Sequence, residues 1–493
     1  MKELKLVAKG GVFSLLGDAT NYFLSYVFLF VATHLLGAAA LGGFFWALSI
    51  AGLIGEFADA GTGQGLIYFG SKYETEKGEN KSFPVFRFVL AFTMLNSIIL
   101  GALLFIFAPN LSAFFHKPDL VWLLRLFALA MPIRAFWPVL YKYFVARFKI
   151  VEGILYGDVL RPILRVAFLL VFIFLAMNGY ALIGVELAVG AILVLIGLML
   201  LFKIWGKKIF SEKLGSSEAK SVLLYSIPFL PLNMARGERV IIIIVGFFMA
   251  AAEVGVFGVV LKLAAISQVI LTGLNFVFRP MVTKLYSENN FATLSSIYKS
   301  ITRWIFVLTL PFSYFFIFFP GPVLALFGEQ FPAGAAALAI VSVGYLFEFG
   351  TSATQVIISM TGRSWLSLFN QLACLLAIML FAFALIPSYG MLGAALAVSA
   401  GIITINLLRL FQSYRMVGFT PYSFYLLKPV MSAVISGIAI YLFFPAGQIL
   451  SIPRFFILAG LFLLLYGVLI FILGIDKEDR ELFSIAKKRI LGT

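Results

Sequence analysis

The chain has 493 residues, of which 62% are hydrophobic and only 12% are charged, and its formal net charge is +15. This composition excludes a soluble protein, because too few polar side chains remain to cover a water-facing surface. Nucleic-acid binding is also excluded, because lysine and arginine gather in alternate loops between long apolar runs, as they do in membrane proteins.

The few cysteine and histidine residues limit the disulfides and metal sites that the chain can form. The single cysteine, Cys374, rules out an internal disulfide framework. The two histidines, His34 and His116, lie far apart near predicted helix ends, which argues against a histidine metal site. We therefore expect no metal and no cofactor.

Apolar runs long enough to cross a bilayer follow one another along nearly the whole chain. About 20 such residues suffice for one crossing, so the sequence predicts an all-α integral membrane protein with about fourteen transmembrane helices. The first six are expected at residues 11–35, 41–68, 85–108, 120–146, 153–177 and 180–203. The next six are expected at 221–248, 253–284, 297–320, 333–360, 365–387 and 390–413, and two more at 426–444 and 454–475.

The basic residues of the loops predict the orientation of these helices. One set of loops is rich in lysine and arginine, whereas the opposite set holds little beyond Lys117 and Arg454. Both termini are therefore expected on the cytoplasmic side of the cell membrane. Lys2, Lys5 and Lys9 precede an apolar run that is too long for a signal peptide, so we expect a retained first helix.

A repeat divides the chain into domains. Residues 41–50 align with 254–263, and residues 184–203 align with 393–412, both at an offset of about 210 residues. Parallel repeats of this kind are typical of transporters. The predicted domains are a six-helix bundle at 1–203, a cytoplasmic linker at 204–220, a second six-helix bundle at 221–413, two extra helices at 414–475 and a cytoplasmic tail at 476–493.

Charged side chains interrupt the apolar segment at residues 227–246. Arg236, Glu238 and Arg239 fall in its middle, where each ionised group costs about 2.5–3.5 kcal/mol even on lenient insertion scales. Pro228 and Pro231 lie upstream and predict a kink or break in the helix. The charges must therefore face the protein interior or water, either as a functional site or as an internally paired cluster.

Three stretches resemble the polysaccharide-exporter branch of the multidrug/oligosaccharidyl-lipid/polysaccharide (MOP) superfamily. They are LLGAAALGGFFWALSIAGLIGEFADAGTGQGLIYFGSKY at 35–73, AAAEVGVFGVVLKLAAISQVILTGLNFVFRPMVTKLYSEN at 250–289 and SYGMLGAALAVSAG at 388–401. The resemblance implies two six-helix bundles in a V, with two extra C-terminal helices. It further implies a Wzx-type flippase that moves lipid-linked oligosaccharide to the outer leaflet.

The buried charges supply a site for such a substrate. Guanidinium groups bind pyrophosphate oxygens through bidentate, charge-assisted bonds. The candidate substrate-binding residues are Arg134, Arg165, Arg236, Arg239 and Lys262. Acidic residues that either bind a coupling ion (H⁺ or Na⁺) or balance these cations are Asp18, Glu56, Asp59, Glu238 and Glu348. Asp158, Arg161 and Arg165 are spaced to form a ladder that is either functional or internally satisfied.

Three other functions stay open. A lipid II flippase would need nearly the same head-group chemistry, and a MATE-like exporter of small cations would need a less positive interior. A membrane glycan polymerase or ligase is disfavoured, because the outer loops are short and nearly uncharged. We therefore expect no enzymatic activity and no catalytic residue. The expected partners are lipid-linked oligosaccharide, membrane lipids and other polysaccharide assembly proteins.

Overall fold

The computed structural model describes residues 2–76, 82–175, 180–205, 214–234, 237–361, 363–443 and 452–473. These residues form helices joined by short connections, with no strand among them. Nine of the described helices are long and apolar enough to cross a membrane. The predicted all-α membrane class is confirmed, and each of the fourteen predicted ranges overlaps a helical segment. The number of crossings itself stays a prediction.

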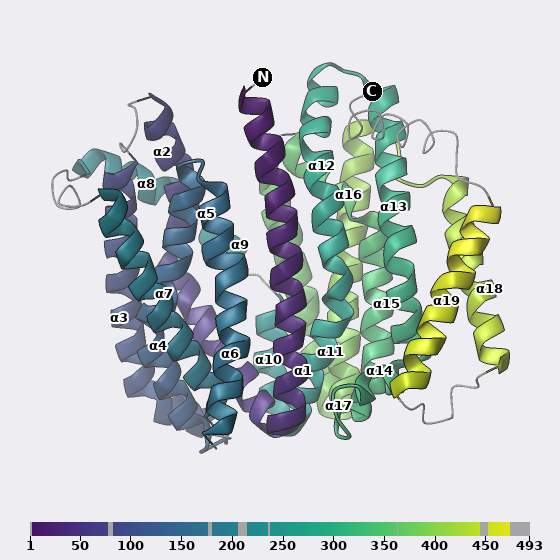
Figure 1. Cartoon of the computed structure of the whole chain (residues 1–493), viewed down its shortest axis with the longest axis horizontal. Helices are drawn as coiled ribbons and strands as arrows, with labels where there is room; N and C mark the ends of the chain where they lie inside the picture. The colour runs from purple at the N-terminus through teal and green to yellow at the C-terminus, as the bar shows by residue number, and fades with distance from the viewer. Residues whose placement is uncertain are drawn as a thin grey trace. The chain divides into compact units, whose positions relative to one another are not determined.

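The helices belong to two compact units, Met1–Gly258 and Val259–Thr493. In the first unit, α3, α4 and α7 run side by side (Figure 1). Its elements are α1 (Lys2–Asp59), α2 (Thr62–Glu76), α3 (Phe83–Phe114), α4 (Leu120–Ala146), α5 (Ile150–Ile154), η1 (Leu155–Leu160), α6 (Arg161–Phe174), α7 (Ala181–Trp205), α8 (Ser216–Ser226), α9 (Phe229–Met234) and α10 (Gly237–Phe248).

The second unit begins within α11 (Ala251–Ala264). It continues through η3 (Ala265–Ser267), α12 (Gln268–Ser287), α13 (Phe291–Phe318), α14 (Pro320–Ala325), η4 (Phe331–Gly334), α15 (Ala335–Thr351), α16 (Ala353–Met360), α17 (Ser364–Val417), η5 (Phe424–Leu426), α18 (Leu427–Phe443) and α19 (Ile452–Ile472). An aromatic contact attaches α19 to α13, where Tyr314 stacks on Phe462 at 4.4 Å between ring centroids. Tyr466 adds a hydrogen bond to the Val307 carbonyl at 2.9 Å.

Two elements, α1 and α17, are too long to be single crossings. At 1.5 Å per residue, a straight helix of 58 or 54 residues would far exceed a hydrocarbon core of about 30 Å. Each contains one glycine at positive φ, Gly37 (76°) in α1 and Gly390 (54°) in α17. A Cβ built on Gly393 would lie only 2.4 Å from the Leu385 carbonyl oxygen, so the chain folds back on itself beside Gly390. α17 therefore comprises two predicted helices joined by a tight turn. α1 comprises the predicted helix at 11–35 and most of the next one, because the helix predicted at 41–68 is broken at Ala60 and Gly61, both at positive φ (46° and 74°), before α2 begins.

Where the predicted helices are broken, proline explains two of the breaks. The break expected at Pro228 and Pro231 is confirmed, because α8 ends at Ser226 and the short α9 follows. The π-helical element η1 lies directly before Pro162, which cannot donate a backbone hydrogen bond. α8 packs on α2, and α10 packs on the second half of α1. Residues 206–213 of the predicted linker and all of the predicted tail at 476–493 lie outside the described part.

The two segments of the predicted repeat meet within the first unit. A Cβ on Gly42 would clash with the Ala251 carbonyl oxygen, and a Cβ on Gly255 would clash with the Ala38 carbonyl oxygen. Gly42 and Gly255 occupy equivalent positions of the aligned stretches 41–50 and 254–263. The contact is thus reciprocal, because each glycine lies against the backbone of the segment that carries the other. Only residues without a side chain permit this close backbone approach.

Candidate functional site

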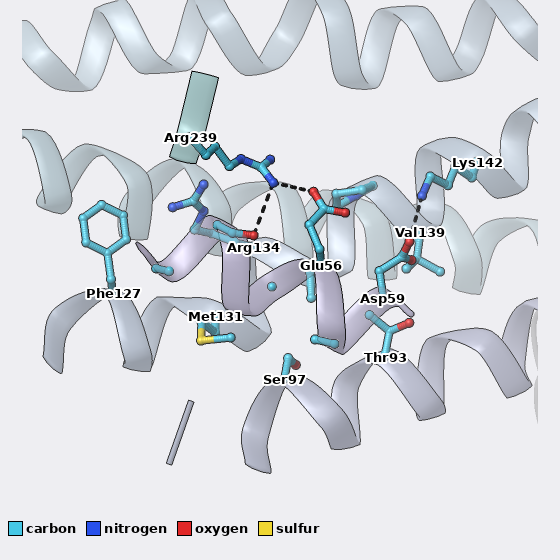
Figure 2. A pocket seen from close by; sticks show the side chains of 16 residues that line it. Glu56, Asp59, Thr93, Ser97, Phe127, Met131, Arg134, Val139, Lys142 and Arg239 are labelled. Atoms are coloured by element: carbon cyan, nitrogen blue, oxygen red, sulfur yellow. Dashed lines mark hydrogen bonds and ion pairs between the residues drawn. The ribbon is translucent and has the colours of Figure 1, made fainter. Parts of the chain in front are cut away.

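A cavity of about 210 Å³ lies inside the first unit, between α1, α3, α4 and α10 (Figure 2). Its wall combines charged, hydroxyl and apolar side chains. The lining residues are Ala51, Gly52, Gly55, Glu56, Ala58, Asp59, Thr93, Ser97, Phe127, Met131, Arg134, Ala135, Pro138, Val139, Lys142 and Arg239. A polar cavity within apolar helices is the place where substrate passage is expected.

Arg239 reaches from α10 to α1 across this cavity. Its Nη1 atom lies 2.5 Å from the Oε1 atom of Glu56 and donates a second hydrogen bond to the Gly52 carbonyl at 3.3 Å (Figure 2). About 31% of the Arg239 side chain and 15% of the Glu56 side chain are exposed. The pair is therefore shielded from bulk water yet accessible from the cavity.

A second ion pair lies at the α2 end of the same cavity. The Nζ atom of Lys142 lies 3.5 Å from the Oδ2 atom of Asp59. The other oxygen of Asp59 accepts a hydrogen bond from the Gly63 amide at the start of α2, at 3.2 Å. Glu56 and Asp59 thus line one cavity from successive turns of α1, as their spacing of three residues predicts. Each has a cation opposite.

Arg134 connects the cavity with a second charged cluster between α4, α6 and α7. Its Nε atom lies 3.8 Å from Glu186, and an Nη atom of Arg165 lies 2.8 Å from the other oxygen of the same carboxylate. Glu186 is only 6% exposed. One buried carboxylate is thus shared by two arginines, each also stacked on an aromatic ring, Phe127 for Arg134 and Phe28 for Arg165.

Arg161 adds a third arginine to this cluster. Its guanidinium lies 4.4 Å from the centre of the Trp137 ring and interacts electrostatically with Arg165, Glu186, Arg134 and Asp158. Asp158 in turn hydrogen-bonds Tyr141 and lies near Asp18. The charges of Asp158, Arg161 and Arg165 are therefore not all neutralised by one another. Arg165 forms its ion pair with Glu186 on another helix.

The acidic and basic side chains of these two groups balance in number. In the cavity, Arg239 and Lys142 are matched by Glu56 and Asp59. In the adjoining cluster, the three arginines face Glu186 and Asp158, and Asp18 lies near Asp158. Partnered cations avoid the large cost of an unpaired buried charge. They remain able to exchange a carboxylate for another anion of suitable geometry.

The C-terminal end of α10 is fixed by Lys117, one of the two bases that sequence analysis placed on the far side. Its ammonium group donates hydrogen bonds to the carbonyls of Gly246 and Met249 and lies 4.5 Å from the centre of the Trp46 ring. The Trp46 indole donates to the Ile243 carbonyl at 3.2 Å. Burial lowers the pKa of Lys117, and Glu253 acts in the opposite direction. A cation at a helix C-terminus satisfies carbonyls that the helix cannot.

The structure brings together some of the predicted site residues and separates others. Arg134 and Arg239 line the cavity, and Arg165 shares Glu186 with Arg134. Glu238 is exposed, so it does not contribute to the cavity wall. Lys262 and Glu348 belong to the second unit, and Arg236 lies outside the described residues.

Lys142 and Glu186 are two charged residues to which the sequence assigned no role. Their partners come from other helices, so no local spacing could reveal the pairs. Thr93 and Ser97, which contribute hydroxyls to the cavity, occupy successive turns of α3 in a strongly apolar helix. The spacing of four residues, which places both hydroxyls on one helix face, was the sequence pattern that could have indicated their role.

The chain is similar to known proteins both in its sequence and in its fold. Residues 7–236 match the family model described as polysaccharide biosynthesis protein. No curated protein matches the sequence. The structure of the lipid II flippase MurJ in an inward closed conformation aligns with a TM-score of 0.67 at 14% identity, covering 98% of this chain and 100% of that one.

Two further solved structures share the fold. An inward-facing multidrug resistance MATE family transporter of the MOP superfamily aligns with a TM-score of 0.66 at 17% identity, covering 81% of this chain and 94% of that one. A MOP superfamily transporter from Pyrococcus furiosus aligns with a TM-score of 0.56 at 17% identity, covering 84% and 96%. These matches confirm the resemblance inferred from the sequence. The chain is a multi-pass membrane protein with the fold of the MOP superfamily, and its residues 7–236 match polysaccharide biosynthesis proteins.

Proposed function

We propose that this protein is a flippase that carries lipid-linked oligosaccharide, attached through isoprenoid pyrophosphate, from the inner to the outer leaflet by alternating access. The observation that carries the proposal is the convergence of Arg134 and Arg239 on one cavity from α4 and α10. Both termini would lie in the cytoplasm, as the loop charges predict.

The ion pairs around the cavity suit a site that alternates between empty and loaded states. Without substrate, Glu56 and Glu186 hold the guanidinium groups of Arg239 and Arg134 in place. A pyrophosphate carries more charge and more acceptor oxygens than one carboxylate, and its geometry matches the guanidinium fork. The head group therefore displaces the carboxylates when it enters.

The energetic task of the protein is to hydrate the head group during its passage. The lipid tail stays in the bilayer, whereas each sugar hydroxyl transferred into hydrocarbon costs about 4–8 kcal/mol without a hydrogen-bond partner, and an ionised phosphate costs far more. Thr93 and Ser97 offer hydroxyl groups beside the arginines for this purpose. A negative head group leaving a negative-inside cell also gains about 2.3 kcal/mol per charge per 100 mV. No covalent chemistry is required.

The extent of the structural matches favours a lipid-linked substrate over a small molecule. The lipid II flippase structure covers 98% of this chain, whereas the MATE transporter covers 81%. The C-terminal helices α18 and α19 extend the chain in the way that the family resemblance associates with lipid carriers. A lipid II flippase is the second candidate for the same reason.

The test is transport in proteoliposomes loaded with purified isoprenoid-pyrophosphate oligosaccharide or with lipid II. The wild type is expected to move the oligosaccharide carrier, and Arg134→Gln with Arg239→Gln is expected to slow it about 100-fold or more, since two charge-assisted contacts are lost. Lys284→Gln serves as the control, because Lys284 is 74% exposed at the end of α12. Transport of lipid II alone would establish the second candidate instead, and wild-type rates in the double variant would refute the site.

A further inference from the structure

The second unit contains a buried carboxyl group that the cavity does not use. Glu348 lies on α15, and its two oxygens accept weak hydrogen bonds from the Gln268 amide on α12, both at 3.3 Å. Among the described residues, no basic side chain comes within ion-pairing distance (4.0 Å) of it. The charged and titratable groups that face it are Arg409 and Cys374, both on α17. The carboxylate is thus buried, and two weak hydrogen bonds from Gln268 stabilise its negative charge only modestly.

Glu348 belongs to a polar seam between α12, α15, α16 and α17. Thr351 donates to Asn406 at 2.8 Å, and Gln355 donates to Ser367 at 3.2 Å. Further along α17, the amides of Asn370 and Gln412 exchange two hydrogen bonds at 2.7 and 2.8 Å. On the second half of α17, Asn406, Arg409 and Gln412 recur every three residues, so they share a face toward this seam.

Several buried atoms around the seam have no protein partner. They are the Oδ1 atom of Asn275, the Oγ atom of Ser352, the Oε1 atom of Gln355 and the Nε atom of Arg409. Asn275 follows Gln268 by seven residues on α12, and Gln355 follows Glu348 by the same interval. Buried polar atoms almost always have a partner, so these atoms indicate a seam that takes up a small polar ligand such as water.

The helices are interrupted on both sides of the carboxyl group. The 3₁₀ turn η3 ends at Ser267, directly before Gln268. On the element that carries Glu348, α15 ends at Thr351, three residues after the carboxyl group, and α16 begins at Ala353, five residues after it. Irregular backbone at membrane depth persists where protein or water satisfies it. The two interruptions therefore flank the same hydrogen bond between Gln268 and Glu348.

We propose that Glu348 is a proton-binding site that couples transport to the proton gradient, with the polar seam as the path by which water reaches it. Coupling to transport rests on the proposed function, whereas proton binding does not. An oxygen of the carboxylate accepts a proton from water in the seam, and the resulting carboxylic acid returns it to water at the end of the cycle. The Gln268 amide serves both states, because it donates to the carboxylate through its nitrogen and accepts from the acid through its oxygen.

The donor set favours a proton over a metal ion. Sodium and other hard cations need several oxygen ligands around one point, whereas the side chains that face Glu348 are the Gln268 amide, the Arg409 guanidinium and the Cys374 thiol. The nearby guanidinium of Arg409 repels a metal ion but leaves protonation possible. A protonated Glu348 and an ionised Glu348 differ by one charge in a low-dielectric setting, so the two forms favour different arrangements of the hydrogen bond between Gln268 on α12 and Glu348 on α15.

Infrared difference spectroscopy of the protein in lipid nanodiscs tests proton binding without any substrate. The wild type is expected to lose a carboxylic-acid band as the pH is raised, and Glu348→Gln is expected to lack that band. Arg409→Gln should retain the band to higher pH, because the cation that favours the ionised form is removed. Glu288→Gln, at the exposed end of α12, serves as the control and should behave as the wild type does. An unchanged titrating band in Glu348→Gln would overturn the proposal.

Proteoliposomes test the coupling separately. An imposed proton gradient is expected to accelerate movement of the isoprenoid-pyrophosphate oligosaccharide by the wild type and by Glu348→Asp, which keeps the carboxyl group. Glu348→Gln should lose the acceleration entirely. Equal acceleration in Glu348→Gln, or acceleration by a sodium gradient alone, would refute the coupling. If the wild type moves no oligosaccharide under any gradient, the proposed function fails, and the infrared result still decides the proton site.

Discussion

At the residue scale, the local spacing of charges was predictable and their partners were not. Glu56 and Asp59 share a cavity wall, as residues three apart on a helix should. The partner of each comes from a different element, Arg239 on α10 and Lys142 on α4. Pairing across nearly 200 residues of chain depends on how helices pack, which spacing alone does not encode.

The pair between Glu56 and Arg239 gives a stability prediction. Glu56→Gln is expected to lower the free energy of unfolding by about 1–3 kcal/mol, because the partly buried Arg239 loses its carboxylate. Adding Arg239→Gln should recover part of that loss, since no unpaired charge remains. Thermal unfolding in detergent measures both. Additive losses in the double variant would show that the two side chains do not interact.

At the element scale, hydropathy predicted where helices occur, and proline predicted one of their breaks. The break after Ser226 was expected from Pro228 and Pro231. The turn at Gly37 falls in the gap between two predicted helices, and the turn at Gly390 falls on the first residue of the helix predicted at 390–413, because a run of apolar residues does not show where the chain reverses. The role of Lys117 was also hidden, because its partners are backbone carbonyls that every sequence has.

The turn within α17 predicts a specific cost. Gly390→Ala is expected to destabilise the protein by about 1–2 kcal/mol, because an L side chain disfavours positive φ. Gly460→Ala in α19 is the matched control, since no atom lies within 4 Å of the added methyl group. There, the better helix propensity of alanine should leave stability unchanged or slightly raised. Equal melting temperatures for the two variants would contradict the assigned turn.

The contacts at the end of α10 predict local dynamics. Lys117→Met with Trp46→Phe removes the three side-chain hydrogen bonds to the carbonyls of Ile243, Gly246 and Met249. Amide hydrogen exchange over residues 243–252 should accelerate at least tenfold, because this end of the helix loses its tether. Lys284→Met leaves these contacts intact and should exchange like the wild type. Unchanged exchange in the double variant would mean that the tether does not hold α10.

At the scale of the whole molecule, composition predicted an all-α membrane protein, and the internal repeat predicted a transporter. Gly42 and Gly255 of the aligned stretches lie in close backbone contact within the first unit, whereas the division of the chain into two repeated bundles stays a prediction. The excess of positive charge proved smaller than the sequence indicated, because Glu56, Asp59 and Glu186 each lie against a cation. In the proposed function, the site holds its own counter-ions between cycles, which would explain why so many charges persist in a protein this apolar.

The central claim is that the guanidinium groups of Arg134 and Arg239 hold a phosphate-bearing lipid head. An experimental structure with bound isoprenoid-pyrophosphate oligosaccharide tests it most directly. We expect phosphate oxygens within hydrogen-bonding distance of both arginines, with Glu56 turned away from Arg239. A structure with the head group bound elsewhere and the Glu56–Arg239 pair intact would contradict the claim.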